Sequence, residues 1–240
     1  MLHTSARFRR ALGALSVVSA VLAALGSVAA CGGTGRSDGK GPSREAPADA
    51  ADSLEKLIVA EVEGFEVTGA TAAEVRATDA VTASEAACQP IADLVGTVTA
   101  GSPSDTVYRQ LIASSEPRDR TAPAVLVALS SYPRGGAARA LAALGEAVSA
   151  CEGGFTTTAA DGEEGRDVYS EVEAENGPAG LDESLAFELT GTLDGERLPL
   201  KYTLVRTGDT VALFYAMNPF DPASVAIAPT VTAAQMARLM

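Results

Sequence analysis

The sequence of 240 residues contains no tryptophan, and its single histidine, His3, lies within an N-terminal segment that we expect to be removed. The mature chain then has no histidine for a serine triad, a cysteine–histidine pair or a metal site. No phosphate-binding glycine loop or nucleophile elbow follows a predicted strand. A carboxylate-only hydrolase is the one enzyme class left open. We expect no enzymatic activity, no metal and no cofactor.

Charge is absent from residues 11–30, an alanine-rich apolar stretch that follows three arginines and ends in Val28-Ala29-Ala30-Cys31. A basic start, an apolar middle and small residues before a cysteine are typical of a lipoprotein signal peptide. We predict that residues 1–30 are removed and that Cys31 carries a lipid anchor with palmitate-type chains. The protein would then lie on the extracytoplasmic face of the cell membrane. An uncleaved transmembrane anchor is the alternative, because 20 apolar residues can span a bilayer.

Large apolar side chains are missing from residues 31–53, which are rich in Gly, Ser, Pro, Asp and Ala. Such a segment cannot bury enough surface to offset its ordering entropy, so we expect a flexible tether. The folded part is then residues 54–240, which is the size of one domain.

Positive charge is scarce. The formal net charge of −13 becomes −16 when the three arginines of the signal peptide are removed, so nucleic acid and anionic lipid headgroups are poor partners. Twelve carboxylates lie in residues 161–200 beside only Arg166 and Arg197. We interpret this region as a solvated acidic rim. Within it, residues 161–167 lack the spacing of a calcium loop, and a solvated turn is the better interpretation.

Cysteine is equally sparse, because only Cys88 and Cys151 remain once Cys31 is lipidated. In an oxidising, exported compartment this pair indicates one disulfide. A catalytic or metal-binding thiol is the weaker alternative, because no histidine accompanies it.

Apolar periodicity predicts several helices. The clearest covers residues 136–151, where apolar residues recur at three- and four-residue steps. A capping-box pattern at residues 82–85 predicts a helix that continues through Cys88 and Ile91, with Pro90 either kinking it or marking its first turn. Short helices are expected over residues 54–61 and after Pro229.

Strands are predicted over residues 106–114 and 122–132, near Phe155 and over residues 168–175. The strand over residues 122–132 has apolar residues at both odd and even positions, so both of its faces should be covered. Two-residue turns at Asp194-Gly195 and Gly208-Asp209 would align a three-stranded meander on one apolar face. This face would carry Leu185, Phe187, Leu189, Leu200, Tyr202, Leu204, Leu213, Tyr215 and Met217. The expected fold is α+β, an antiparallel sheet of about five to seven strands covered by helices on one face, with one disulfide.

The order of these segments resembles a known family. LEKLIVAEVEGFEV, ACQPIADLV, VLVALSSYPRGGAARALAALGEAVSACEGGF, LVRTGDTVALFYAMN and PTVTAAQMARL are similar to PknH-like extracellular sensor domains and their free-standing lipoprotein relatives in actinobacteria. The resemblance implies a cleft between sheet and helices that binds an extracellular ligand without catalysis. Cys88 and Cys151 match family cysteines that are expected to pair. The chain differs in lacking tryptophan, a second cysteine pair and a kinase domain.

Two functions remain open from the sequence. The first is a membrane-anchored, sensor-like module that binds a small amphipathic ligand. Its cleft would have Tyr202 or Tyr215 at the mouth, because a buried phenol needs a partner, and Arg134 or Arg206 as an anchor for an anionic group. The second is a structural or interaction lipoprotein that docks a cationic envelope partner through its acidic surface. High salt should weaken only the second kind of binding.

Overall fold

The computed structural model describes residues 47–240 except 76–80, 114–123, 160–165 and 194. The predicted signal peptide, Cys31 and most of the predicted tether therefore lie outside the described residues, as do the acidic segment 161–165 and Asp194 of the first expected turn. None of the described helices is long and apolar enough to cross a bilayer.

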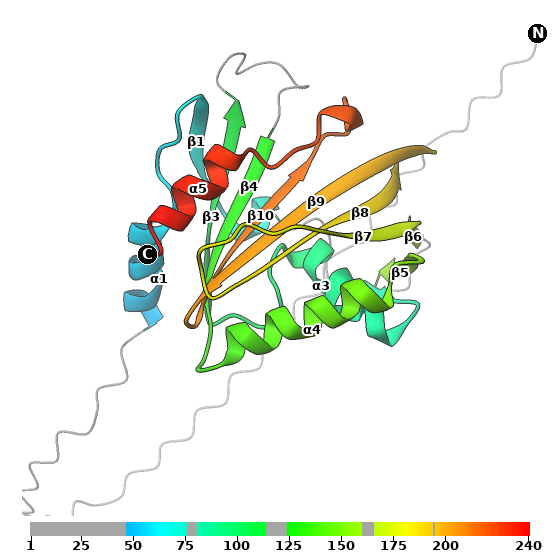
Figure 1. The fold of residues 1–240 in the computed structure, drawn as a ribbon, viewed down its shortest axis with the longest axis horizontal. Coiled ribbons are helices and arrows are strands. Elements are labelled where there is room, and N and C mark those ends of the chain that lie inside the picture. Colours follow the sequence, from blue (N-terminus) through cyan, green and yellow to red (C-terminus); the bar gives the residue numbers. More distant parts are fainter. Residues whose placement is uncertain (1–46, 76–80, 114–123, 160–165, 194) are drawn as a thin grey trace, which may run out of the picture. The chain divides into compact units, whose positions relative to one another are not determined.

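Seven antiparallel strands form the main sheet in the order β1-β3-β4-β10-β9-β8-β7 (Figure 1). Three more strands form a small sheet in the order β2-β5-β6. The main sheet consists of β1 Phe65–Ala70, β3 Asp105–Ala113, β4 Ala124–Ser131, β7 Glu171–Glu175, β8 Glu183–Leu193, β9 Glu196–Thr207 and β10 Thr210–Met217. The small sheet consists of β2 Val81–Ala83, β5 Phe155–Ala159 and β6 Arg166–Tyr169. The α+β class with a seven-stranded antiparallel sheet is confirmed.

The meander β8-β9-β10 has the register that the turn pattern predicts. Phe187 pairs with Tyr202, and Tyr202 pairs with Tyr215. The flanking leucine pairs also lie as expected, with Leu204 between Leu185 and Leu213. The turn at Gly208 is tight enough to set the pairing of β9 and β10, and Gly208 has a positive φ of 56°.

Helices cover both faces of the main sheet, whereas the sequence led us to expect cover on one face. The helices α3 Gln89–Thr97 and α4 Gly136–Ala150 pack on the face that carries Tyr202 and Leu204. The helices α1 Pro47–Leu57 and α5 Pro229–Ala237 pack on the opposite face (Figure 1). The physical reason lies in the central strands. In β4 and β10 both the odd-numbered and the even-numbered residues are mostly apolar, as predicted for β4. Both faces of the sheet therefore have to be covered by helices.

The helix α1 begins at Pro47, inside the segment that we expected to be tether, and ends at Leu57 rather than at residue 61. Leu54 and Ile58, one helical turn apart, are buried against the sheet. Gln235 of α5 is also fully buried and ties the two helices together. Its side chain accepts a hydrogen bond from Val59 N at 2.7 Å and donates one to Leu57 O at 3.1 Å. Tertiary contacts of this kind stabilise a helix whose own sequence is weakly apolar.

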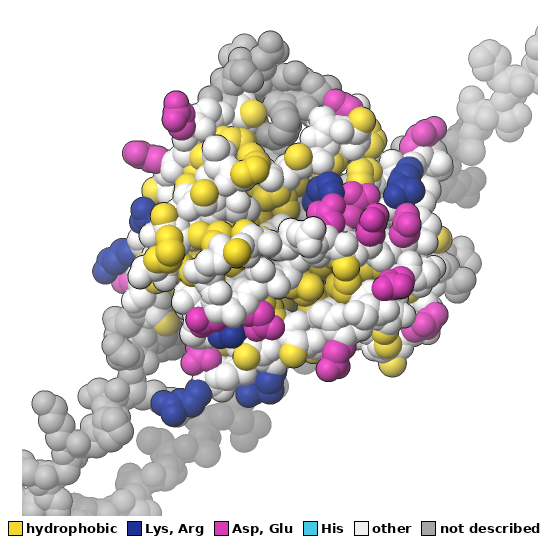
Figure 2. Space-filling model, in the orientation of Figure 1, with side chains coloured by type: hydrophobic (Ala, Val, Ile, Leu, Met, Phe, Trp, Pro, Cys, Tyr) yellow, Lys and Arg dark blue, Asp and Glu magenta, His cyan; other side chains and the backbone are white. Residues whose placement is uncertain are grey.

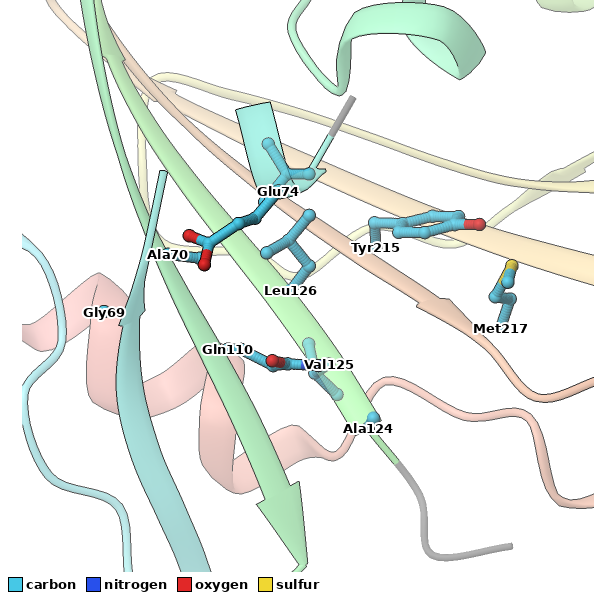
Figure 3. Close-up of a pocket in the computed structure, with 10 residues that line it drawn as sticks. Gly69, Ala70, Glu74, Gln110, Ala124, Val125, Leu126, Tyr215 and Met217 are labelled. Carbon is cyan, nitrogen blue, oxygen red and sulfur yellow. The ribbon is translucent and has the colours of Figure 1, made fainter. Parts of the chain in front are cut away.

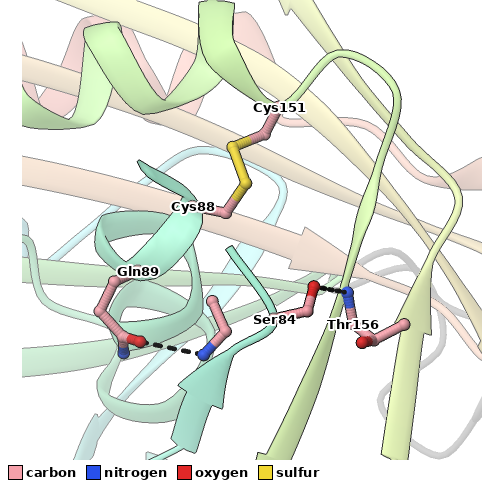
Figure 4. Close-up of a disulfide and its surroundings, with 6 residues drawn as sticks. Ser84, Cys88, Gln89, Cys151 and Thr156 are labelled. Carbon is pink, nitrogen blue, oxygen red and sulfur yellow. Dashed lines mark hydrogen bonds between the residues drawn. A yellow bond between two sulfur atoms is a disulfide. The ribbon is translucent and has the colours of Figure 1, made fainter. Parts of the chain in front are cut away.

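The expected capping box at residues 82–85 is wrong. Thr82 lies in β2, and Ser84 Oγ accepts a hydrogen bond from Thr156 N of β5 at 3.1 Å (Figure 4). A short 3₁₀ turn, η1 Ala86–Cys88, precedes α3, and Pro90 marks the first turn of that helix. Polar residues that can cap a helix can also pair along a strand edge, and here strand pairing takes precedence. The remaining short helices are α2 Ala72–Val75 and η2 Pro222–Ser224.

Cys88 and Cys151 form the predicted disulfide, with a Cα–Cα distance of 5.9 Å (Figure 4). Cys151 follows the last turn of α4, whose buried stripe includes Leu141, Leu144 and Val148 as expected. Gln89 anchors the same region, because its side chain accepts from Ala83 N at 2.9 Å and donates to Val81 O at 2.8 Å. The disulfide and these bonds hold α3 between α4 and the small sheet.

The segment 168–175 forms two strands rather than one. The strand β6 ends at Tyr169 in the small sheet, and β7 begins at Glu171 at the edge of the main sheet. Ser170 N donates to Thr190 O of β8, so the chain passes from one sheet to the other at this residue. The buried parity changes here, since Tyr169 is buried at an odd position and Val172 at an even one, and the prediction of a single strand overlooked this shift.

Candidate functional site

A pocket of about 390 Å³ opens on the α3 and α4 face of the main sheet, where β4 begins and β10 ends (Figure 3). Leu126 of β4 and Tyr215 and Met217 of β10 form an apolar floor. Gln110 of β3 and Glu74 of α2 add polar groups at its rim. Apolar concave surface with a few polar groups is the usual composition of a small-molecule site.

Glu74 is the only charged side chain among the described residues that line this pocket. Its carboxylate accepts hydrogen bonds from Thr71 Oγ1 at 2.7 Å and Thr71 N at 2.8 Å. The Thr71 side-chain hydrogen bond, followed by the backbone one, lowers the pKa of Glu74 below its usual value. Figure 3 places this carboxylate over Ala70, on the opposite side of Leu126 from the Tyr215 hydroxyl. The charge thus lies at one edge of the pocket.

Aromatic rings form a row across β8, β9 and β10 on the same face. The centroids of Phe187 and Tyr202 are 5.1 Å apart, and those of Tyr202 and Tyr215 are 5.0 Å apart, both stacked. Tyr215 is half-buried and lines the pocket, whereas Tyr202 is 2% exposed and lies one strand further in. The sequence prediction therefore names one residue that lines the pocket and one directly behind it.

The two arginines that we expected to hold an anionic group lie elsewhere. Arg206 pairs with Glu183 at 2.9 Å and Asp182 at 3.3 Å, and its partner residue on β10 is Val211. Six residues of strand separate Val211 from Met217, which is about 20 Å. Arg134 is exposed in the connection between β4 and α4, also at the far end of β4 from the pocket. Neither arginine lines the pocket, because both belong to the opposite end of the sheet.

Basic residues form ion pairs with five of the eight carboxylates of the acidic rim that the structure describes. Lys201 bridges Glu175 and Glu188, and Arg197 bridges Glu171 and Glu188. Figure 2 shows acidic and basic side chains interleaved on this side of the molecule. Burial lowers the pKa of Lys201, but the two carboxylates outweigh this effect and raise it overall. No described group of three or more acidic, cysteine or histidine side chains is arranged to hold a metal ion.

Sequence reasoning missed Leu126, Gln110, Glu74 and Met217 as pocket residues. The Thr71-x-x-Glu74 spacing is typical of a capping box and signals only a helix start. The sequence pattern indicates that Leu126 is a core residue of a central strand. It does not show which end of this strand the helices leave uncovered.

No protein-family model and no curated protein sequence matches the chain. Among solved structures, the extracellular domain of PknH from Mycobacterium tuberculosis is similar with 14% identity and a TM-score of 0.48. The match covers 79% of this chain and 94% of that one. At this identity and score, the likeness carries no conclusion about ligand or partner.

The buried tyrosines predict a loss of stability at alkaline pH. Burial raises the pKa of Tyr132 to about 12 and raises those of Tyr169, Tyr202 and Tyr215 above their usual value. In the unfolded chain each titrates near about 10. Their contribution is therefore complete below about pH 10 and is lost as the pH rises through the folded values. Each phenol contributes a slope of about 1.4 kcal/mol per pH unit in that window.

Urea unfolding between pH 8 and 11.5 measures this effect. We expect a constant midpoint up to about pH 9.5 and a steep fall above it. The variant Tyr132→Phe should show a shallower fall, because one of the four shifted phenols is removed. A midpoint that stays constant to pH 11.5 would contradict the prediction.

Proposed function

We propose that this chain is a lipid-anchored, extracytoplasmic, non-enzymatic module that binds a small amphipathic ligand in the pocket formed by Leu126, Tyr215, Met217, Gln110 and Glu74. The observation that carries the proposal is the pocket itself, an apolar floor on an otherwise helix-covered sheet face with polar groups only at the rim. The arrangement suits a ligand whose apolar body lies on β4 and β10.

The sequence and the disulfide support the proposed extracytoplasmic location. The basic, apolar and small-residue succession ending at Cys31 is the pattern of an exported lipoprotein. The buried Cys88–Cys151 disulfide agrees with export, since such bonds persist in oxidising compartments. Docking of a cationic partner is the weaker candidate, because Lys201, Arg197 and Arg206 already engage five of the eight described carboxylates of the acidic rim.

The absence of tryptophan makes a direct binding test possible. The substitution Met217→Trp, at an exposed position of the pocket floor, would give a full chain with one tryptophan at the ligand site. The probe is 1-bromooctane, an apolar molecule whose bromine quenches a nearby indole. We expect saturable quenching, weakened when Gln110→Phe fills the pocket. The matched control is Thr192→Trp, on an exposed position of β8 that lines none of the described pockets. Equal, non-saturating quenching at both positions would refute the proposed function.

Lipidation predicts a complete change of location in a single variant. The variant Cys31→Ala removes the thiol that forms the thioether, so we expect the protein either to leave the membrane fraction or to remain as an uncleaved precursor. Membrane fractionation with mass spectrometry of the N-terminal peptide distinguishes these products. A mature N-terminus at any residue other than 31 would be incompatible with the prediction.

A further inference from the structure

Three tyrosines meet beside the pocket. Tyr215 lines it, and Tyr202 stacks on Tyr215 from the next strand. Tyr169 comes from the small sheet and lies over Gly191 of β8, where an added Cβ would meet Tyr169 Cε1 at 3.5 Å and Leu200 Cδ1 at 3.6 Å. Leu200 pairs with Met217 of the pocket. The three rings therefore belong to one region of the α3 and α4 face.

The hydroxyl groups of these tyrosines lack protein partners. Within the described part of the chain, none of the three makes a hydrogen bond, although Tyr169 is 7% and Tyr202 is 2% exposed. By contrast, the buried Tyr132 hydroxyl donates to Ala100 O at 2.6 Å. A buried phenol normally finds a partner, and leaving it without one costs free energy. Three such groups in one place require an explanation.

The phenol oxygens are also accessible. Among the described residues, Ser131 Oγ is the one side-chain polar atom that is both fully enclosed and without a partner. Each of the three phenol oxygens therefore keeps some solvent-accessible surface, and the oxygen of Tyr215 belongs to a residue that lines the pocket. Their mutual proximity is consistent with the pKa of Tyr202, which burial raises first and Tyr215 and Tyr169 raise further.

Resting on the proposed function, we infer that Tyr169, Tyr202 and Tyr215 bind an uncharged, oxygen-bearing head group of the ligand, such as an alcohol or an amide carbonyl. A neutral phenol both donates and accepts hydrogen bonds, so the three hydroxyls suit such a group. A carboxylate or phosphate would be buried with no cation among the described pocket residues, and this is costly. An ammonium group would lie on the opposite side of Leu126 from Glu74 (Figure 3). The apolar tail of the proposed ligand would occupy the pocket floor, which Leu126 and Met217 form.

The test extends the Met217→Trp quenching assay to a matched probe series of 8-bromooctanol, 8-bromooctanoate and 8-bromooctylammonium, with 1-bromooctane as the reference without a polar head. We expect 8-bromooctanol to bind more tightly than either charged probe. The variants Tyr169→Phe, Tyr202→Phe and Tyr215→Phe should each weaken 8-bromooctanol about two- to tenfold, the contribution of one hydrogen bond. Binding of 1-bromooctane should be unchanged in Tyr169→Phe and Tyr202→Phe, because neither residue lines the pocket floor.

Stability gives an independent readout. Because the hydroxyls have no hydrogen-bond partner among the described residues, each Tyr→Phe variant should unfold at the same temperature as the parent or a higher one. Tyr132→Phe is the matched control and should unfold at a lower temperature, since it loses the bond to Ala100. The inference is overturned if 1-bromooctane binds but the Tyr→Phe variants leave 8-bromooctanol unaffected, or if a charged probe binds as tightly. Failure of 1-bromooctane itself would instead refute the proposed function.

Discussion

Substituting Gly154 by alanine is expected to destabilise the fold by about 3 kcal/mol or more, because two costs of about 1–3 kcal/mol each combine. Gly154 has a φ of +82°, which strains any residue with a Cβ. A Cβ at this position would also lie 2.2 Å from Tyr169 O and 2.6 Å from Ser170 C. These are backbone atoms at the passage from β6 to β7, so they cannot move aside as a flexible side chain would.

The adjacent glycine provides the control for this prediction. A Cβ on Gly153 would meet no heavy atom within 4 Å, so Gly153→Ala should change stability by no more than about 0.5 kcal/mol. Urea unfolding monitored by circular dichroism measures both variants. Equal midpoints for the two would show that β5 and β6 do not approach as closely as described. Because Tyr169 must shift when Gly154 gains a Cβ, the same variant should also weaken 8-bromooctanol binding.

Removing the disulfide has the second large expected effect. The bond joins residues 63 positions apart, and closing a loop of that length stabilises the folded state by about 4 kcal/mol on the chain-entropy account. The double variant Cys88→Ala/Cys151→Ala should therefore lose about 4 kcal/mol of a stability that is typically about 5–15 kcal/mol for a domain. Both sulfurs are buried, so the bond in the parent should resist reduction until the protein unfolds.

Two measurements check the disulfide. Intact mass after alkylation without reduction should show Cys88 and Cys151 unmodified, and urea unfolding should give the loss in the double variant. The control variant is Cys31→Ala, which removes a cysteine outside the pair and the described domain and should leave the urea midpoint of that domain unchanged. Alkylation of both residues in the folded protein would end the prediction.

Local patterns predicted the meander because turns and alternation act over short distances. Gly208-Asp209 sets the pairing of β9 with β10, and a shift by one residue would turn Tyr202 away from the core. The buried stripe of α4 was predictable because its apolar residues recur at helical spacing. The pairing of Cys88 with Cys151 was predictable because they are the only two cysteines that follow Cys31.

The errors lie where two kinds of local structure compete. Thr82 and Ser84 can cap a helix or extend a strand, and pairing with β5 decides between them. The start of α1 was missed because residues 47–53 lack large apolar side chains, and the helix depends on Leu54 and Ile58 packing against the sheet. The apolar residues on both sides of β4 indicated that helices cover both faces at this strand. The expected fold nevertheless had helices on only one face of the sheet.

By itself, the sequence determined the class of fold, the register of the last three strands, the disulfide and the absence of histidine from the part that follows residue 30. These depend on composition, periodicity and turn geometry, which are local properties. Only the tertiary structure decided which residues form the pocket, because Leu126 and Tyr215 meet across two strands at the end of the face that α3 and α4 leave open. It also brought Tyr169 over Gly191 of β8 and placed Arg206 about 20 Å from Met217, with Arg134 at the same far end of the sheet, since strand length and chain reversal set those positions.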